Sequence, residues 1–314
     1  MFSYRHAFHA GNHADVLKHT VLIAILKHLT EKDAALTVVD THAGAGLYRL
    51  DGDYSTTGAE ATDGVAKLFA ALAPAGSAKP AIENIADKLQ DYIDLIASFN
   101  TNGQLKVYPG SPFVTQSLLR EEARDKLKLF ELHPTDHKAL EGNIAQLKAG
   151  RQVAVECKDG FEGLKSYLPP PISATGSRRA LVLIDPSYEV KTDYAKVSAC
   201  IQDCLKRFPT GTYAVWYPVI PRPEAHDLPR RLKTLATQAN KPWLHTTLNI
   251  GQGPEMDEVT VPGERAPRPG LTASGMFVIN PPHTLKAAMQ AALPQMLTVL
   301  GRGRGKGWTA DSGG

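Results

Sequence analysis

A short polar turn follows one of the most apolar stretches of the chain. Residues 181–184 are LVLI, and the next four are Asp185, Pro186, Ser187 and Tyr188. The amino group of a nucleobase is a poor nucleophile, because its lone pair is delocalised into the ring. A carboxylate and a backbone carbonyl could accept its two N–H groups and aim the lone pair at an electrophilic methyl group, while an aromatic side chain stacks on the base. The D-P-x-Y order therefore favours methylation of an amine on a planar substrate, and its alternative explanation is a strand exit with a core tyrosine.

Acids and glycines end the other apolar runs. Glu131 in FELHP stands where doubly wound nucleoside sites place the acid that binds ribose hydroxyls, and Asp159-Gly160 closes the next run. Small residues at 40–46, DTHAGAG, would let the backbone approach a ligand, with a helix after them offering unpaired N–H groups. Each alone also fits a simple turn. Together they indicate a nucleoside without phosphates, and Arg49 replaces the third glycine of a dinucleotide fingerprint.

The elements that must position these residues follow from apolar spacing. Asn12 can cap a helix at 13–30 whose apolar residues recur every four positions. Nearly continuous apolar runs predict parallel strands covered on both faces. These runs lie at 36–39, 127–131, 153–157, 180–184, 213–216, 244–250 and 276–279. We expect a doubly wound α/β fold with a seven-stranded, mostly parallel sheet and a ligand crevice at the carboxyl ends of the strands.

Three segments depart from this rhythm. Residues 50–106 predict a helical insertion, with helices at 61–72 and 82–99, so that 1–49 and 107–300 form the main domain. The stretch 251–270 is rich in Gly, Pro and charge, which is typical of a loop. The tail 301–314, which starts GRGRGKGW, predicts a flexible basic end.

Composition narrows the class of protein. The 314 residues are 43% hydrophobic and 21% charged, and no apolar run approaches the roughly 18 residues of a membrane helix. The start MFSYRHAFHAG lacks a signal peptide, and three cysteines without C-x-x-C spacing predict neither disulfides nor zinc. We therefore expect a cytoplasmic protein. A monomer is also expected, although no feature of the sequence sets the oligomeric state. The net charge of +3 is too small to indicate nucleic-acid binding by itself.

Several segments together resemble one family. The sequence is similar to the RlmJ-type methyltransferases, which use S-adenosylmethionine to methylate N6 of one adenine in 23S ribosomal RNA and have the Rossmann-like class I methyltransferase fold. The segments that carry the resemblance are SYRHAFHAGNHADVLKHT, DTHAGAG, YPGSP, FELHP, LVLIDP with KTDY, GTYAVWYP and LTASGMFVINPP. The DPSY turn is similar to the D/N-P-P-Y/F/W motif of amino-group methyltransferases.

The resemblance implies a set of site residues. Asp185 would engage the adenine amine with Pro186 and Tyr188, and Tyr4 would contact the substrate RNA. The cofactor would be held by Lys18, His19, His42, Ser111, Glu131, Asp159, Gly160 and Asp185. No metal is expected, although His6, His9, His13 and His19 lie close together in the sequence; the segment matches a cofactor and RNA contact block instead.

Ser187 departs from the family, whose members usually have proline there. The turn loses one fixed φ, so a less rigid loop is expected rather than lost chemistry. The alternatives are a DNA adenine or protein glutamine methyltransferase, which share the P-x-Y logic, and an RNA chaperone that binds the cofactor without transferring its methyl group. A nicotinamide oxidoreductase is opposed by the missing glycine pattern. The adenine must leave its stack, which favours protein-free or partly assembled RNA as the substrate.

Overall fold

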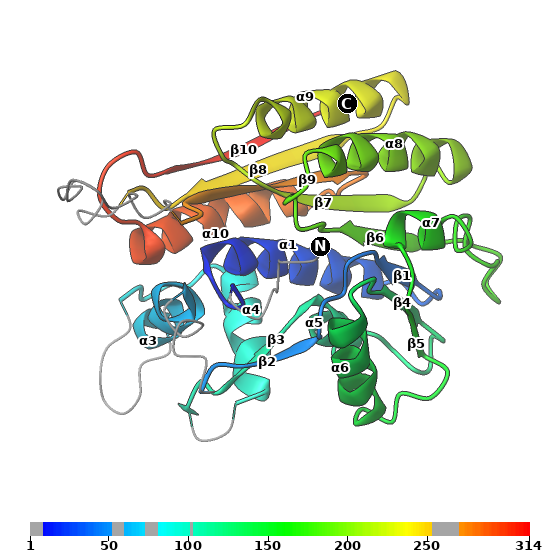
Figure 1. The fold of residues 1–314 in the computed structure, drawn as a ribbon, viewed down its shortest axis with the longest axis horizontal. Helices are drawn as coiled ribbons and strands as arrows, with labels where there is room; N and C mark the ends of the chain where they lie inside the picture. Colours follow the sequence, from blue (N-terminus) through cyan, green and yellow to red (C-terminus); the bar gives the residue numbers. More distant parts are fainter. Residues whose placement is uncertain (1–8, 52–59, 73–80, 101–102, 253–269) are drawn as a thin grey trace.

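One large sheet, with helices on both faces, organises the chain (Figure 1). The computed structural model describes residues 9–51, 60–72, 81–100, 103–252 and 270–314. The sheet has eight strands in the order β10-β8-β9-β7-β6-β1-β4-β5. They are β1 (Thr37–Asp40), β4 (Lys126–Phe130), β5 (Val153–Glu156), β6 (Ala180–Ile184), β7 (Thr212–Pro218), β8 (Trp243–Asn249), β9 (Ala273–Ile279) and β10 (Gly307–Gly313). All seven expected strands are present, and the doubly wound α/β fold is confirmed.

The register of the central strands brings their carboxyl ends to one edge. In the parallel pairs of β1, Asp40 lies opposite Leu129 of β4 and Leu183 of β6. Strands β4–β5 and β6–β7 are also parallel, whereas β9 runs antiparallel to both β7 and β8. The residues that follow β1, β4, β5 and β6 therefore gather at the edge where such sheets bind ligands.

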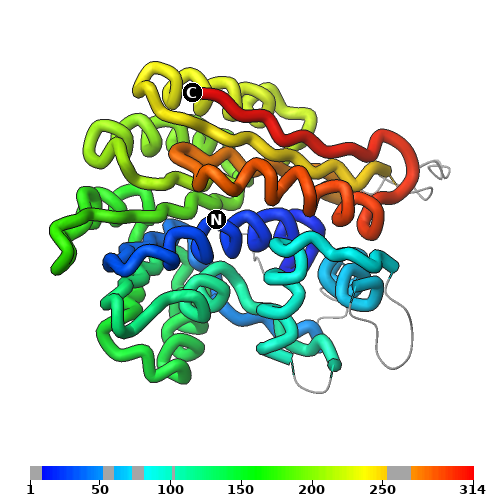
Figure 2. Tube along the Cα trace, turned by 180° about the vertical axis from the view of Figure 1, so that it is seen from behind, coloured from blue at the N-terminus to red at the C-terminus, as the bar shows by residue number. Residues whose placement is uncertain are grey.

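Alternation along the strands divides the core into two layers. In β6, Val182 and Ile184 face α8 (Thr192–Arg207) and α9 (Pro223–Gln238). Leu181 and Leu183 face the opposite layer, which contains α1 (His13–Thr30) and α10 (Leu285–Leu300). Figure 2 shows α1 and α10 side by side on that face. Because both faces of β6 are covered, the whole strand is apolar.

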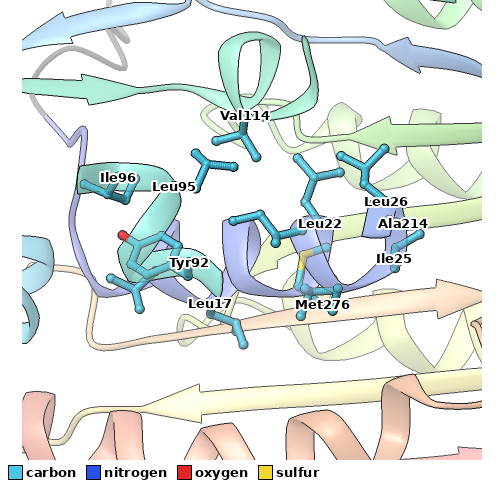
Figure 3. Close-up of a cluster of buried hydrophobic side chains, with 14 of the residues drawn as sticks. Leu17, Leu22, Ile25, Leu26, Tyr92, Leu95, Ile96, Val114, Ala214 and Met276 are labelled. Atoms are coloured by element: carbon cyan, nitrogen blue, oxygen red, sulfur yellow. The ribbon is translucent and has the colours of Figure 1, made fainter. Parts of the chain in front are cut away.

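Helix α1 is buried on nearly every side. Asn12 caps it, since its Oδ1 accepts from the backbone nitrogens of Ala14 and Asp15 at 2.9 and 3.1 Å. Apolar side chains of α1 pack between the sheet and α4 (Asp87–Ser98) of the insertion, as Figure 3 shows for Leu17, Leu22, Ile25 and Leu26 against Tyr92, Leu95, Ile96, Val114, Ala214 and Met276. The expected helix at 13–30 is confirmed, and it buries polar residues such as Asp15, Lys18 and His19 together with its apolar ones.

The insertion is helical, as expected, but a small hairpin closes its base. Its helices are η2 (Thr62–Ala66), α3 (Lys67–Leu72) and α4, close to the predicted helices. The antiparallel pair β2 (Leu47–Arg49) and β3 (Val107–Pro109) was not predicted, because three-residue strands leave no periodic pattern. We had expected a helix directly after the turn 40–46. The turn leads into β2 instead. The helix that packs behind β1 is α5 (Ser111–Gln116), which follows the insertion.

The expectation of a flexible tail was wrong, and the sheet has one strand more than predicted. Strand β10 pairs antiparallel with β8, from Gly307 opposite Asn249 to Gly313 opposite Trp243. Gly303 and Gly305 adopt positive φ in the turn before it, which glycine does without strain. The tail thus covers the edge of β8, which would otherwise be open. The composition of the tail does not show that this edge requires a partner. Within the described ranges, no helix is both long and apolar enough to cross a bilayer.

Candidate active site

A cleft of about 300 Å³ opens at the carboxyl ends of β1, β4, β5 and β6. Helices α6 (Pro134–Ala145) and α7 (Gly160–Leu164) begin beside it, after β4 and β5 respectively. Of the residues expected from the sequence, the cleft is lined by Lys18, His42, Ser111, Glu131, Asp159, Gly160, Asp185 and Pro186. Most of the predicted site residues are therefore brought together in one place.

Lys18 lies between two carboxylates at the back of the cleft. Its Nζ donates to Asp185 Oδ2 at 2.7 Å and is 2.8 Å from Asp15 Oδ1, with all three side chains largely buried. Burial lowers the pKa of Lys18, but attraction by Asp15 and Asp185 outweighs it and holds that pKa well above its usual value. The resemblance implied that Lys18 helps to hold the cofactor, which stays a prediction. In this structure its ammonium group contacts Asp185.

The turn after β6 directs Tyr188 away from the cleft. Its φ is +54°, its side chain is buried, and its hydroxyl donates to the Trp216 carbonyl at 2.6 Å. The ring packs against those of Tyr194 and Trp216, with centroids 4.6 and 6.0 Å away. Because the ring is enclosed by the core, it offers no face to a base in this structure. The core-tyrosine explanation of D-P-x-Y holds for Tyr188, while Asp185 and Pro186 line the cleft.

Asp40, at the end of β1, supports the floor of the cleft. Ser111 Oγ donates to its Oδ2 at 2.6 Å, and the His42 backbone nitrogen donates to Oδ1 at 3.2 Å. Burial raises the pKa of Asp40 to about 6, although both hydrogen bonds oppose the shift. Burial also lowers the pKa of His42 to about 4, so its ring is neutral, and it packs edge-on against Phe161. We missed Asp40 and Phe161 as individual residues, although both lie in or beside motifs at strand ends.

Glu131 ties the first turn to the end of β4. Its Oε2 accepts from the Gly44 backbone nitrogen at 2.8 Å and its Oε1 from that of His133 at 2.7 Å. Burial raises the pKa of Glu131, while these hydrogen bonds lower it. Each carboxylate oxygen has a second lone pair, so Glu131 can still accept from two vicinal hydroxyls. Leu132 beside it is an exposed apolar side chain on the cleft wall.

Asp159 and Gly160 form a close turn after β5. Asp159 Oδ1 accepts from the Phe161 backbone nitrogen at 2.9 Å and caps α7. A Cβ on Gly160 would lie 1.9 Å from the Thr41 carbonyl oxygen, so only glycine allows this approach. The turn after β5 can therefore lie directly against the turn after β1.

His19 and Tyr4 are the remaining predicted residues. His19 is fully buried on α1, and its Nδ1 lies 2.7 Å from the Tyr108 hydroxyl, with the two rings stacked. It does not line the cleft in this structure, since it faces the insertion and not the sheet edge. Tyr4 lies outside the described residues, so its contact with RNA stays a prediction.

The charge of the cleft fits a cationic nucleoside. Its lining contains carboxylates from several elements and two lysines. The carboxylates are Glu131, Asp136, Asp159, Asp185, Glu189 and Asp193, and the lysines are Lys18 and Lys196. A pyrophosphate would be repelled by such a lining, whereas a sulfonium ion would be attracted. The acceptors at Glu131 and Asp159 and the apolar Leu132 and Phe161 suit a ribose and a purine. These residues therefore fit S-adenosylmethionine.

The chain is similar to known proteins over nearly its whole length, including the segments that form the cleft. The model of a family described as ribosomal RNA large subunit methyltransferase D, RlmJ, matches residues 33–311. The ribosomal RNA large subunit methyltransferase J of Escherichia coli K12 is 42% identical over 300 residues, which cover 96% of this chain and 94% of that protein. Its namesake from Haemophilus influenzae is 38% identical over 313 residues, covering 99% and 98%. A crystal structure of a Legionella pneumophila protein matches with a TM-score of 0.77 and 31% identity, covering 97% of this chain and 98% of that one.

Proposed function

The chain belongs to the RlmJ family of ribosomal RNA methyltransferases that use S-adenosylmethionine, and on that premise we propose that it methylates N6 of an adenine in 23S ribosomal RNA. The family resemblance noted in the sequence is thereby confirmed. The choice of an amine as the target is carried by one observation. Buried Lys18 holds Asp185 at the sheet edge, where Asp185 and Pro186 both line the cleft and would supply two acceptors for an NH₂ group.

In this proposal Asp185 and Pro186 orient the base. Lys18 occupies Asp185 Oδ2, and among the described residues none donates to Oδ1 or to the Pro186 carbonyl. These two oxygens would accept the two N–H groups of the adenine, and Oδ1 would take the proton that the amine loses on methyl transfer. S-adenosylmethionine supplies the electrophilic methyl group. The chain's own contribution is therefore positioning and hydrogen bonding.

The cofactor would be held by the turns around the cleft. Glu131 would accept from the ribose hydroxyls, and Asp159 from the adenine of the cofactor. His42 and Ser111 would contact it from the turn after β1 and the start of α5. His19, which lies behind α1, would act through the position of that helix. Tyr4, by family resemblance, would contact the RNA.

The substrate follows from the need to extrude the target base. Unstacking costs a few kcal/mol and is least costly in a loop or in incompletely folded RNA. We therefore propose protein-free or partly assembled 23S RNA as the substrate, which would place the enzyme in the cytoplasm, where bacterial ribosomes assemble. The monomeric state expected from the sequence stays a prediction.

The test is methyl transfer to transcribed 23S RNA, with the product nucleoside identified by mass spectrometry. Asp185→Ala should lower kcat by roughly 10²–10³-fold, because a preorganised acceptor at the reacting amine is lost. Asp203→Ala serves as the control, since Asp203 forms an exposed pair with Arg207 on α8. Equal activity of Asp185→Ala and the wild type, or a product other than N6-methyladenosine, would overturn the proposal. Cofactor binding without transfer would favour the RNA-chaperone alternative, and faster transfer to DNA the DNA methyltransferase.

A further inference from the structure

We propose that Arg222 is a positioning residue that holds the Asp185–Tyr188 turn in its reactive shape. Arg222 precedes α9 and does not line the cleft. Its Nη1 donates to the Tyr188 carbonyl at 3.1 Å. The inference rests on the proposed function, because the turn matters to catalysis only if Asp185 and the Pro186 carbonyl bind the reacting amine.

The turn needs restraint because its backbone is unfavourable. Tyr188 has a φ of +54°, which residues other than glycine rarely adopt. Such a backbone conformation persists only when the surrounding structure enforces it. Two hydrogen bonds enforce it here, one from the Tyr188 hydroxyl to the Trp216 carbonyl and one from Arg222 to the Tyr188 carbonyl. The first holds the side chain and the second holds the main chain.

The middle of the turn has no anchor of its own. Within the described part of the chain, neither Pro186 nor Ser187 forms a hydrogen bond. Among the described residues, hydrogen bonds therefore fix the turn at its ends, from Lys18 to Asp185, from Arg222 to Tyr188 and from Tyr188 to Trp216. Ser187 adds to this need, since a proline there would fix one φ by itself.

Arg222 is well suited to hold the main chain in place. Its own backbone is fixed at the start of α9, where its carbonyl accepts from the nitrogens of Ala225 and His226 and its nitrogen donates to Ile220. The side chain is half-buried, and its guanidinium is a rigid, permanently charged donor. A hydrogen bond from such a group is stronger than one between neutral partners.

The experiment compares Arg222→Met, Arg222→Lys and the double variant Arg222→Met with Ser187→Pro. We expect Arg222→Met to lower kcat about tenfold or more, because a small misplacement of positioning groups has effects of this size. Cofactor affinity by calorimetry should change less than twofold, since Glu131 and Asp159, which would hold the ribose and adenine of the cofactor, lie on other turns. Arg222→Lys should keep part of the activity through its remaining donor. Ser187→Pro should restore part of kcat in the double variant, because it fixes the turn by another route.

Hydrogen exchange gives a readout that does not depend on activity. Amides of residues 188–191 should exchange faster in Arg222→Met than in the wild type, and Ser187→Pro should slow them again. The matched control is Arg230→Met on the same helix, where Arg230 forms an exposed pair with Asp227. It should leave both kcat and exchange unchanged.

The outcomes separate this inference from the proposed function. Unchanged kcat and exchange in Arg222→Met would overturn the inference while leaving N6 methylation intact. Parallel losses of kcat, cofactor affinity and melting temperature, without recovery by Ser187→Pro, would show a merely structural role and would also overturn it. A wild type that methylates no adenine would instead reject the proposed function, and faster exchange in Arg222→Met would then show that the clamp exists without serving that reaction.

Discussion

Two aspartates at the same edge of the sheet have opposite electrostatic surroundings. Asp185 is paired with the ammonium group of Lys18, which compensates its charge. Asp40 accepts from a hydroxyl and a backbone nitrogen among the described residues, and burial raises its pKa to about 6. The difference suits their proposed roles, because Asp185 would accept from the substrate amine while Asp40 holds Ser111 and the His42 backbone in place.

The raised pKa of Asp40 predicts a pH-dependent stability. The folded state binds a proton more tightly than the unfolded state, so this group favours folding below pH 3.8 and loses that contribution as pH rises through about 6. The loss totals about 3 kcal/mol, of which about 1 kcal/mol falls between pH 5 and 7.5. In Asp40→Asn the loss is absent, so the free energy of unfolding, relative to wild type, should rise by that amount over this interval. Urea unfolding of both proteins without cofactor measures it, and a difference independent of pH would contradict it.

The π-helical turn η2 fixes the insertion against the segment that leads into α1. The Val65 backbone nitrogen donates to the Gly11 carbonyl at 2.7 Å, and Glu60 contacts both His9 and Asn12. Burial lowers the pKa of His9, but its hydrogen bond to Glu60 has the larger effect, so that pKa is raised overall. The insertion therefore supports the helix that carries Lys18.

Close approach at Gly64 makes this contact testable. A Cβ there would lie 2.1 Å from the Gly11 carbonyl oxygen, so Gly64→Ala must separate the two segments. We expect a loss of about 2 kcal/mol or more in the free energy of unfolding, a size typical of overpacking. Gly142→Ala is the control, because no atom lies within 4 Å of its Cβ position in α6 and the change should stabilise by about 0.5–1 kcal/mol. Similar effects of the two substitutions would contradict the interpretation.

The cleft and the C-terminal strand β10 lie at different parts of the same sheet. The cleft lies at the carboxyl ends of β1, β4, β5 and β6. Strand β10 is the outermost strand at the other end of the strand order, next to β8 (Figure 2). The Thr309 hydroxyl of β10 forms a hydrogen bond with the Thr247 hydroxyl of β8. The Ser312 hydroxyl accepts one from Lys286 of α10. The C-terminal strand is therefore part of the main domain and is remote from the site.

Removal of residues 303–314 should affect stability and not binding. The deletion exposes the edge of β8, so we expect a lower melting temperature and a greater tendency to aggregate. Cofactor affinity, measured by calorimetry at a temperature where the shortened chain is folded, should stay within about twofold, or less than about 0.5 kcal/mol. A large loss of affinity in a folded deletion variant would show that the tail acts on the cleft.

Local patterns determined the strands, the first helix and the positions of most site residues. Apolar runs predict strands, and acids such as Glu131 and Asp185 are placed at the site once the strands are parallel, because their carboxyl ends then share one edge. The tertiary structure alone decided the partners. Lys18 and Asp185 are 167 positions apart, and Tyr188 turned into the core because Trp216 and Arg222 hold it there. Strand β10 formed because β8 offered an open edge. These long-range contacts depend on which surfaces meet when the chain packs. Their free energy cannot be predicted from the spacing of residues that are neighbours in the sequence.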